Sequence, residues 1–232
     1  MQLWSEMDSS WVSHTLLMVS GTMTIADLEK VSVRMGATQI LRDITLSIGP
    51  GDAIGLFGSN GAGKTTLLRL LATLILPVAG TATVLGVDPA GDGRYDVRSR
   101  IGFVGHMTGL YPELTLAENL SFVASARGID LAEVDRCLAV VGLAGVADRR
   151  AEVCSHGMQR RAEFARILMT EPDLLLLDEP HSALDGDAVG LVDALVRRTL
   201  DGGGAAVLAS HDRDRVAKLA TDCREISGGT LV

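Results

Sequence analysis

The chain has 232 residues, of which 47% are apolar and only 3% aromatic. A chain of this length can bury a sizeable core, and one built from Ala, Val, Leu and Ile is typical of parallel α/β sheets covered by helices. The 21 basic and 29 acidic residues give a net charge of −8, which argues against nucleic acid as a partner. The three cysteines form no C-x-x-C pair, as expected for reduced thiols rather than a structural zinc site.

Residues 1–22 precede the first strand-like run and lack the patterning of the rest of the chain. They contain Glu6 and Asp8 but no basic residue, and the apolar run from Leu16 to Val19 is too short for a signal-peptide core. Along the whole sequence, no apolar run reaches the roughly 18 residues of a membrane span. We therefore expect a loose, dispensable extension at 1–22 and a chain that does not itself cross a bilayer.

Strand and helix patterns alternate from residue 25 onward. Strands are expected over 25–33, 44–48, 53–57, 81–85 and 101–104, with a helix over 64–75 that Pro77 stops. The β-branched runs then disappear, and helical patterning predicts an inserted lobe with segments 116–126 and 131–141. Uninterrupted apolar runs at 174–177 and 205–209, with a helix over 188–200 between them, indicate central parallel strands.

The residues after the expected strand 53–57 fit the phosphate-loop pattern G-x-x-x-x-G-K-[ST]: Gly58, Ser59, Asn60, Gly61, Ala62, Gly63, Lys64 and Thr65. Glycines let the backbone N–H groups point inward, and the helix that follows adds roughly half a positive charge at its N-terminus. Lys64 then supplies an ammonium group to the β- and γ-phosphates, Thr65 can bind Mg²⁺, and Thr66 lies nearby as another phosphate contact. The pattern predicts binding of ATP with Mg²⁺.

Two carboxylates follow the apolar run 174–177, at the end of the strand where ligands bind in open parallel sheets. Asp178 suits coordination of Mg²⁺ through water. Glu179 can polarise the attacking water as a general base. Together with the phosphate loop, this acidic pair predicts hydrolysis of ATP.

From about residue 25 to the C-terminus the sequence resembles the ABC ATPase family. Besides the two phosphate motifs, the resemblance rests on Cys154 to Met158, similar to the family's LSGGQ signature, on Ser182 to Asp185, which looks like its D-loop, and on His211, similar to its switch histidine. It implies a P-loop NTPase core with a mainly parallel sheet, an N-terminal antiparallel β region and an inserted α-helical subdomain. The expected boundaries are 23–108 and 160–232 for the core and 109–159 for the helical subdomain.

The signature segment supplies its own chemistry. The hydroxyl of Ser155, the backbone N–H groups around Gly157 and the start of a helix expected over 158–169 can meet a γ-phosphate, with His156 and Met158 completing the segment. In the family that phosphate belongs to the facing subunit. Because one chain carries one phosphate loop and one signature, the resemblance implies a head-to-tail, ATP-dependent homodimer, with Glu179 and His211 as catalytic residues and Asp185 in the D-loop.

Several positions depart from the family pattern. His106 aligns with the Q-loop glutamine, and since an imidazole lacks the geometry of an amide, its contact with Mg²⁺ stays open. Met35 aligns near the aromatic residue that stacks on adenine, and a thioether covers the ring less rigidly. Arg160 and Arg161 are interpreted as a solvated helix face. The histidines have no short ligand spacing, so no dedicated metal site is expected.

Within the family, several segments look most like the ATPase subunit of haem exporters used in cytochrome c maturation: 71–74, 104–106, 111–120, 155–159 and 178–185. Exporters of drugs, lipids or polysaccharides share much of this stretch and remain alternatives. ABC ATPases that act on DNA or ribosomes, and a module that binds ATP without hydrolysing it, fit less well. The resemblance implies a separate transmembrane permease as partner and a cytoplasmic position on the inner face of the membrane, but it does not identify the cargo.

Overall fold

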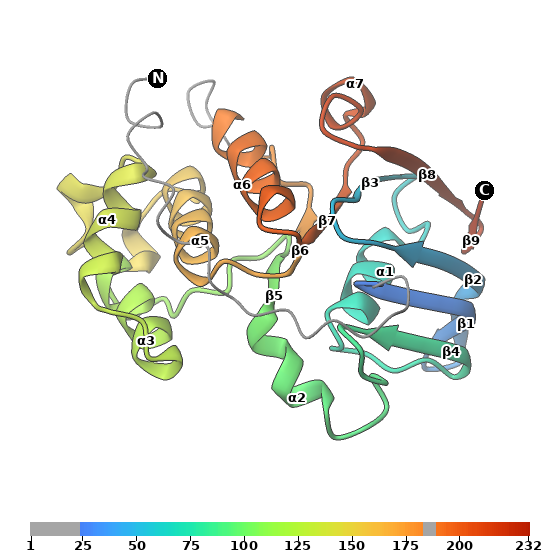
Figure 1. Cartoon of the computed structure of the whole chain (residues 1–232). Coiled ribbons are helices and arrows are strands. Elements are labelled where there is room, and N and C mark those ends of the chain that lie inside the picture. The colour runs from blue at the N-terminus through green and yellow to red at the C-terminus, as the bar shows by residue number, and fades with distance from the viewer. Residues whose placement is uncertain (1–23, 183–188) are drawn as a thin grey trace.

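Two sheets form the β part of the molecule in the computed structural model, which describes residues 24–182 and 189–232 (Figure 1). The larger sheet has the order β5-β6-β7-β3-β8-β9, parallel except for the β8–β9 pair. Its strands are β3 (Ala53–Phe57), β5 (Ile101–Val104), β6 (Leu174–Asp178), β7 (Ala205–Ala209), β8 (Asp222–Ser227) and β9 (Thr230–Leu231). The extension expected at 1–22 lies outside the described residues.

The smaller sheet is antiparallel and has the order β2-β1-β4. It consists of β1 (Ala26–Met35), β2 (Thr38–Ile48) and β4 (Ala79–Val84). This sheet and the parallel one confirm the predicted α/β class with an N-terminal antiparallel region. Of the strands, β8 and β9 had not been predicted, because Asp222–Ser227 alternates polar residues with only one long aliphatic side chain, Ile226.

Seven α-helices lie within the described residues: α1 (Lys64–Leu71), α2 (Arg94–Val97), α3 (Leu116–Arg127), α4 (Ala132–Val140), α5 (His156–Thr170), α6 (Val189–Asp201) and α7 (Arg213–Val216). Helix α1 is shorter than the predicted 64–75, because the chain turns out of the helix at Thr73, whose φ is 57°. Helix α5 begins two residues before the predicted Met158, because Ser155 caps it. None of the described helices is long and apolar enough to cross a membrane.

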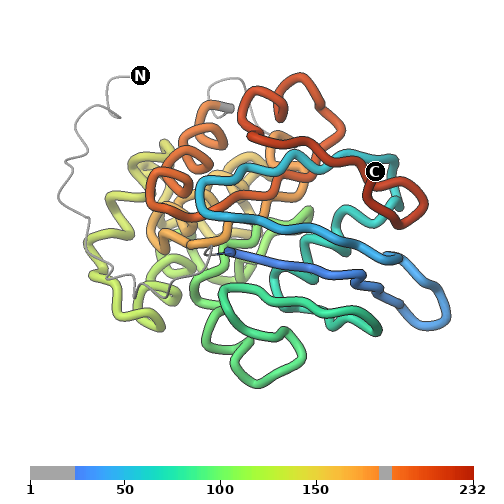
Figure 2. The backbone as a smooth tube through the Cα atoms, turned by 45° about the vertical axis from the view of Figure 1, so that its right-hand side comes forward, coloured from blue at the N-terminus to red at the C-terminus, as the bar shows by residue number. Residues whose placement is uncertain are grey.

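The parallel strands separate two hydrophobic clusters, as their continuous apolar sequences require. Along β6, Leu175 and Leu177 face a cluster shared with α3, α4, α5 and α6, whereas Leu174 and Leu176 face α1 and the antiparallel sheet. This alternation is the two-residue period of a strand. Figure 2 shows the consequence: the helical lobe and the antiparallel sheet lie on opposite sides of the molecule. The predicted boundaries of the helical subdomain stay a prediction, since α5 packs on α3 and α4 and also on β5.

Candidate active site

Three adjacent parallel strands end at the same edge of the sheet, and candidate site residues lie at or just after their ends. Pairing sets Asp178 beside Ala209, and Ala209 in turn beside Leu56. The carboxyl ends of β3, β6 and β7 therefore lie level, and the segment that follows each strand carries one part of the site. This is the edge at which open parallel sheets bind ligands.

The loop between β3 and α1 needs glycine at two closely packed points. Gly58 has a φ of 145°, and a Cβ there would lie 2.4 Å from the carbonyl oxygen of Ile226 in β8. Gly63 has a φ of 115°, and its Cβ would lie 2.7 Å from Cδ2 of Leu41 in β2. Because any side chain at either glycine would clash with these atoms, the two glycines let the loop pack closely against β8 and β2. Such a curved backbone turns N–H groups toward a bound anion.

The side chain of Lys64 lies over this loop. It is buried, and its Nζ donates hydrogen bonds to the carbonyl oxygens of Gly58 at 2.7 Å and Ser59 at 3.2 Å. Helix α1 begins at the same residue, and Gly63 before it provides no side-chain cap. Free N–H groups and an ammonium group thus meet at one point, which is the arrangement that binds phosphate. Thr66, also expected to contact phosphate, is buried in the first turn.

The two expected Mg²⁺ contacts lie together. The hydroxyl of Thr65 donates a 2.7 Å hydrogen bond to Oδ2 of Asp178, although the residues are 113 positions apart in the chain. A hydroxyl and a carboxylate are oxygen donors, the type of ligand that Mg²⁺ prefers. These two residues therefore fit a magnesium ion held beside the phosphate loop. Groups of three or more His, Cys, Asp or Glu that could hold a metal are absent from the described residues.

Glu179 and His211 form a contact at the ends of β6 and β7. Nδ1 of His211 lies 2.9 Å from Oε2 of Glu179, and the His211 side chain is 80% exposed. Glu179 has a φ of 49°, a left-handed conformation that costs a non-glycine residue about 1–3 kcal/mol. Its backbone N–H donates to the carbonyl oxygen of Ala209 at 2.8 Å, which holds the turn against β7. Glu179 thus follows Asp178 directly and has a strained backbone conformation.

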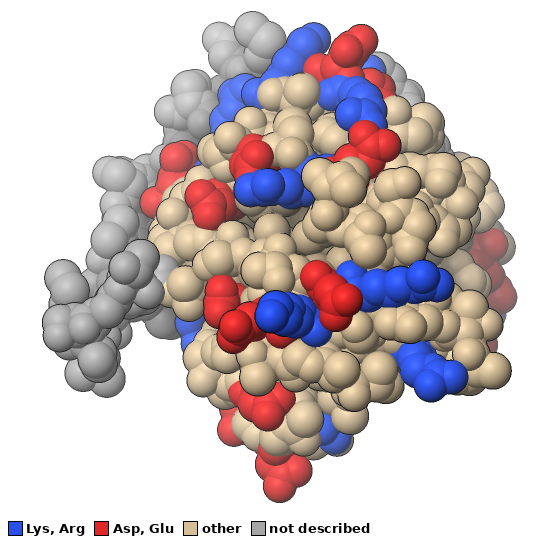
Figure 3. Space-filling view, turned by 90° about the vertical axis from the view of Figure 1, so that its right-hand side faces the viewer, with Lys and Arg blue, Asp and Glu red and all other residues tan. Residues whose placement is uncertain are grey.

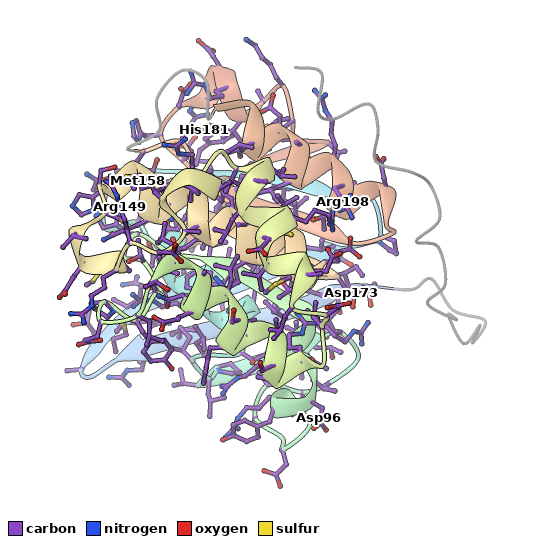
Figure 4. The ribbon with its side chains drawn as sticks, turned by 90° about the vertical axis from the view of Figure 1, so that its left-hand side faces the viewer. Asp96, Arg149, Met158, Asp173, His181 and Arg198 are labelled. Atoms are coloured by element: carbon purple, nitrogen blue, oxygen red, sulfur yellow. The ribbon has the colours of Figure 1, made fainter. Side chains whose placement is uncertain are left out.

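The signature segment lies at the start of α5. The hydroxyl of Ser155 accepts a hydrogen bond of 3.3 Å from the N–H of Met158, while Ser155 and His156 remain exposed and Gly157 is half-buried. In the view of Figure 4, which faces the helical lobe, Met158 lies at the margin of the molecule. Within the described residues, no hydrogen bond or ion pair joins the signature to the phosphate loop of the same chain. The D-loop residue Asp185 lies outside the described residues.

Comparison with known proteins matches residues 41–182 to the family model described as ABC transporter. The chain is 38% identical to the cytochrome c biogenesis ATP-binding export protein CcmA 2 of Cupriavidus metallidurans, over 85% of this chain and 96% of that protein. The chain is an ATPase subunit of the ABC transporter family. Identity is also 38% to the aliphatic sulfonates import ATP-binding protein SsuB 2 of Burkholderia cenocepacia, over 84% of this chain and 71% of that protein.

Solved structures agree with this assignment. A dimeric post-hydrolysis ATP-binding cassette bound to ADP and phosphate superposes with a TM-score of 0.78 at 26% identity, covering 89% of this chain and 96% of that one. The predicted ABC ATPase fold and ATP-binding function are thereby confirmed. One named relative is an export protein and the other an import protein, so family membership alone does not fix the direction of transport for this ATPase.

Two departures from the family pattern lie at exposed positions in this ABC ATPase. Met35, the last residue of β1, is 51% exposed. His106 follows β5 and is also exposed. Among the described residues, no hydrogen bond or ion pair joins the His106 imidazole to Thr65 or Asp178. The roles predicted for Met35 and His106 therefore stay predictions.

The interpretation of Arg160 as part of a solvated helix face is wrong. Arg160 is only 4% exposed, and its guanidinium donates to the carbonyl oxygens of Gly105 at 2.6 Å and His106 at 3.5 Å. It also lies 3.3 Å from the buried carboxylate of Glu163, whose other oxygen accepts from the N–H of Gly109 at 2.9 Å. Burial raises the pKa of Glu163, while the Gly109 N–H and the Arg160 charge oppose that rise.

The sequence did not predict this cluster of Arg160 and Glu163. The cluster holds α5, whose N-terminus carries the signature, against the segment 105–109, which includes His106. The available signal was the opposite charge of Arg160 and Glu163, three positions apart and thus on one face of a helix. The same charge pattern occurs on solvent-exposed helices. Only the packing of α5 against the segment 105–109 shows that this pair is buried.

We expect Arg160→Met to lower the free energy of unfolding by about 3–5 kcal/mol, because it leaves the Glu163 carboxylate buried without its cation. Arg161→Met, at a half-buried position one residue along the same helix, is the matched control and should cost no more than about 1 kcal/mol. Adding Glu163→Leu to Arg160→Met should restore part of the loss. Chemical denaturation of the three variants measures this, and equal stability of the two arginine variants would contradict the buried pair.

We expect Lys64→Ala to weaken ATP binding by about 10- to 100-fold, the loss expected for hydrogen bonds between an ammonium and phosphate oxygens. Arg69→Ala removes a positive charge from an exposed position of the same helix and should leave the affinity unchanged. Titration calorimetry of both variants checks the assignment, which an unchanged affinity of Lys64→Ala would refute.

Proposed function

We propose that this ATPase energises a membrane exporter of haem for cytochrome c maturation, working as a head-to-tail dimer on a separate permease at the cytoplasmic face of the membrane. The observation that carries the hydrolytic part is the placing of Glu179, in contact with His211, directly after Asp178 and its bond to Thr65. A base, a cation site and a phosphate loop thus meet at one sheet edge. Hydrolysis of the γ-phosphate bond by water is the reaction that uses all three.

In this mechanism the residues have separate tasks. Lys64 and the N-terminus of α1 bind the β- and γ-phosphates, with Ser59 to Gly63 and Thr66 lining the cradle. Thr65 and Asp178 would hold Mg²⁺, which when bound neutralises charge on the phosphate oxygens. Glu179 accepts a proton from the attacking water. His211 contacts the same carboxylate from the adjacent strand and can donate to the phosphate as its charge develops.

The dimer is supported by the motif inventory. Each chain has one phosphate loop and one signature, and in this chain they lie at different elements, α1 and α5. Ser155 and His156 are exposed at a helix N-terminus, where a phosphate on a second chain can approach them. One of the similar solved structures is a dimeric ATP-binding cassette, which supports a dimer for this chain as well. We therefore propose that the two chains pack head to tail, each completing the other's site.

The distribution of charged side chains favours a membrane-associated role over nucleic-acid binding. On the face shown in Figure 3, Lys and Arg side chains are interspersed with Asp and Glu instead of forming one continuous basic surface. Nucleic-acid binding depends on clustered cations that replace the counterions of phosphates. The net charge of −8 argues in the same direction. The permease is proposed as a separate protein because the chain resembles ATP-binding subunits of export systems.

We expect Glu179→Gln to bind ATP but to hydrolyse it about 10²- to 10⁴-fold more slowly, the usual effect of losing a general base. Because ATP then stays between the chains, this variant should sediment as a dimer with ATP and as a monomer without it. Adding Ser155→Arg should abolish the dimer and spare ATP binding, since a cationic, bulky side chain would block the approach to the partner's phosphate.

The control for this experiment is Ser125→Arg, which adds the same side chain at an exposed position of α3. It should leave the ATP-dependent dimer of Glu179→Gln intact. Normal hydrolysis by Glu179→Gln, or a dimer indifferent to Ser155→Arg, would refute the shared site.

The cargo needs a test in cells. Deleting the gene in its native host should abolish haem attachment to c-type cytochromes, because a haem exporter supplies the cofactor for that step. The wild-type gene should restore haem-stained cytochromes and the Glu179→Gln gene should not. Full cytochrome levels after deletion would exclude the haem assignment and favour another cargo, to be identified from the permease that copurifies with the ATPase from native membranes.

A further inference from the structure

We infer that Ser210 is a positioning residue for hydrolysis, holding one oxygen of the Glu179 carboxylate so that the other faces the attacking water. The inference rests on the proposed role of Glu179 as the base. Ser210 follows β7 directly and comes just before His211. Its hydroxyl lies 3.1 Å from Oε2 of Glu179, the same oxygen that lies 2.9 Å from Nδ1 of His211.

The direction of the hydrogen bond follows from what else the Ser210 hydroxyl contacts. The backbone N–H of Asp212 donates to the same hydroxyl oxygen at 3.1 Å. A serine hydroxyl has one hydrogen and two acceptor positions, so accepting from Asp212 leaves its hydrogen to be donated to the carboxylate. Ser210 is only 2% exposed, so solvent cannot compete for this hydrogen. The contact is therefore a charge-assisted bond from a buried donor, the stronger class of hydrogen bond.

Ser210 is held far more firmly than His211. The backbone N–H of Ser210 donates to the carbonyl oxygen of Leu56 in β3 at 3.2 Å, and the N–H of Glu179 donates to Ala209 in β7. Donor and acceptor are thus tied to neighbouring strands of one sheet. The His211 side chain, in contrast, is 80% exposed, and its contact with Glu179 has no comparable enclosure.

The hydrogen bond from Ser210 restricts the orientation of the Glu179 carboxylate. Its backbone adopts a left-handed conformation at a φ of 49°, and its side chain is partly exposed, so the carboxylate could rotate away from the phosphate loop. Two donors on Oε2 restrict this rotation, and since no described residue donates to the second oxygen, that oxygen is proposed to face the water. A base must lie within hydrogen-bond reach of the proton it removes, so fixing the carboxylate raises the fraction of productive encounters with water.

The test compares Ser210→Ala with Thr199→Val, which removes a different buried hydroxyl, bonded to Leu195 within α6. We expect Ser210→Ala to lower kcat about 10- to 100-fold while KM for ATP stays at the wild-type value and the melting temperature falls by only a few degrees, the cost of one buried hydrogen bond. Thr199→Val should leave kcat unchanged. A wild-type kcat in Ser210→Ala would overturn the inference, as would a loss of ATP affinity together with a larger fall in melting temperature, which marks a merely structural hydroxyl.

Glu179→Gln, measured in parallel, separates this inference from the proposed function. If Glu179→Gln hydrolyses ATP at the wild-type rate, Glu179 is not the base and both fail. If Glu179→Gln stalls while Ser210→Ala retains full activity, the base assignment stands and the role of Ser210 alone is refuted.

Discussion

The parallel pairing of β6, β7 and β3 is the constraint on which the site depends. In register, Asp178 lies beside Ala209 and Ala209 beside Leu56, so the segments after the three strands begin at one level of the sheet. A residue far along the chain can then bond to the phosphate loop, as Asp178 does with Thr65. A shift of one residue in either pairing would turn alternate side chains to the opposite face and separate these groups.

Much of this arrangement could be predicted from the sequence, because the strongest physical signals are local. Strands 53–57, 101–104 and 205–209 begin and end where their apolar runs do, since uninterrupted apolar runs are typical of strands in a parallel sheet. The phosphate loop is equally local, because the left-handed conformations of its glycines and the helix that follows belong to one short segment. Fold class and family followed from these features, and both were confirmed.

The remainder depends on contacts that a single sequence does not contain. Arg160 has the same charge on the surface and in the interior, and only the carbonyl oxygens of Gly105 and His106, presented by another segment, make its burial possible. In the sequence Ser210 is an ordinary polar residue, and only the fold, in which it follows β7, brings its hydroxyl to Glu179. Strand β8 was missed because its pairing with β3, rather than its own composition, makes it a strand. In each case the deciding partner lies far away in the chain.

Three of the buried polar residues, Arg160, Glu163 and Ser210, lie behind candidate site residues. An unpaired polar group in the interior costs free energy, and these three side chains have hydrogen-bond partners in place. The anchor at Arg160 and Glu163 lies on the same helix as Ser155 and fixes that helix to the segment 105–109. The position of the signature therefore follows from a bond network two turns further along α5. Glu179 is held in the same way through Ser210, so both halves of the proposed shared site rest on buried donors and acceptors behind the residues proposed to contact ATP.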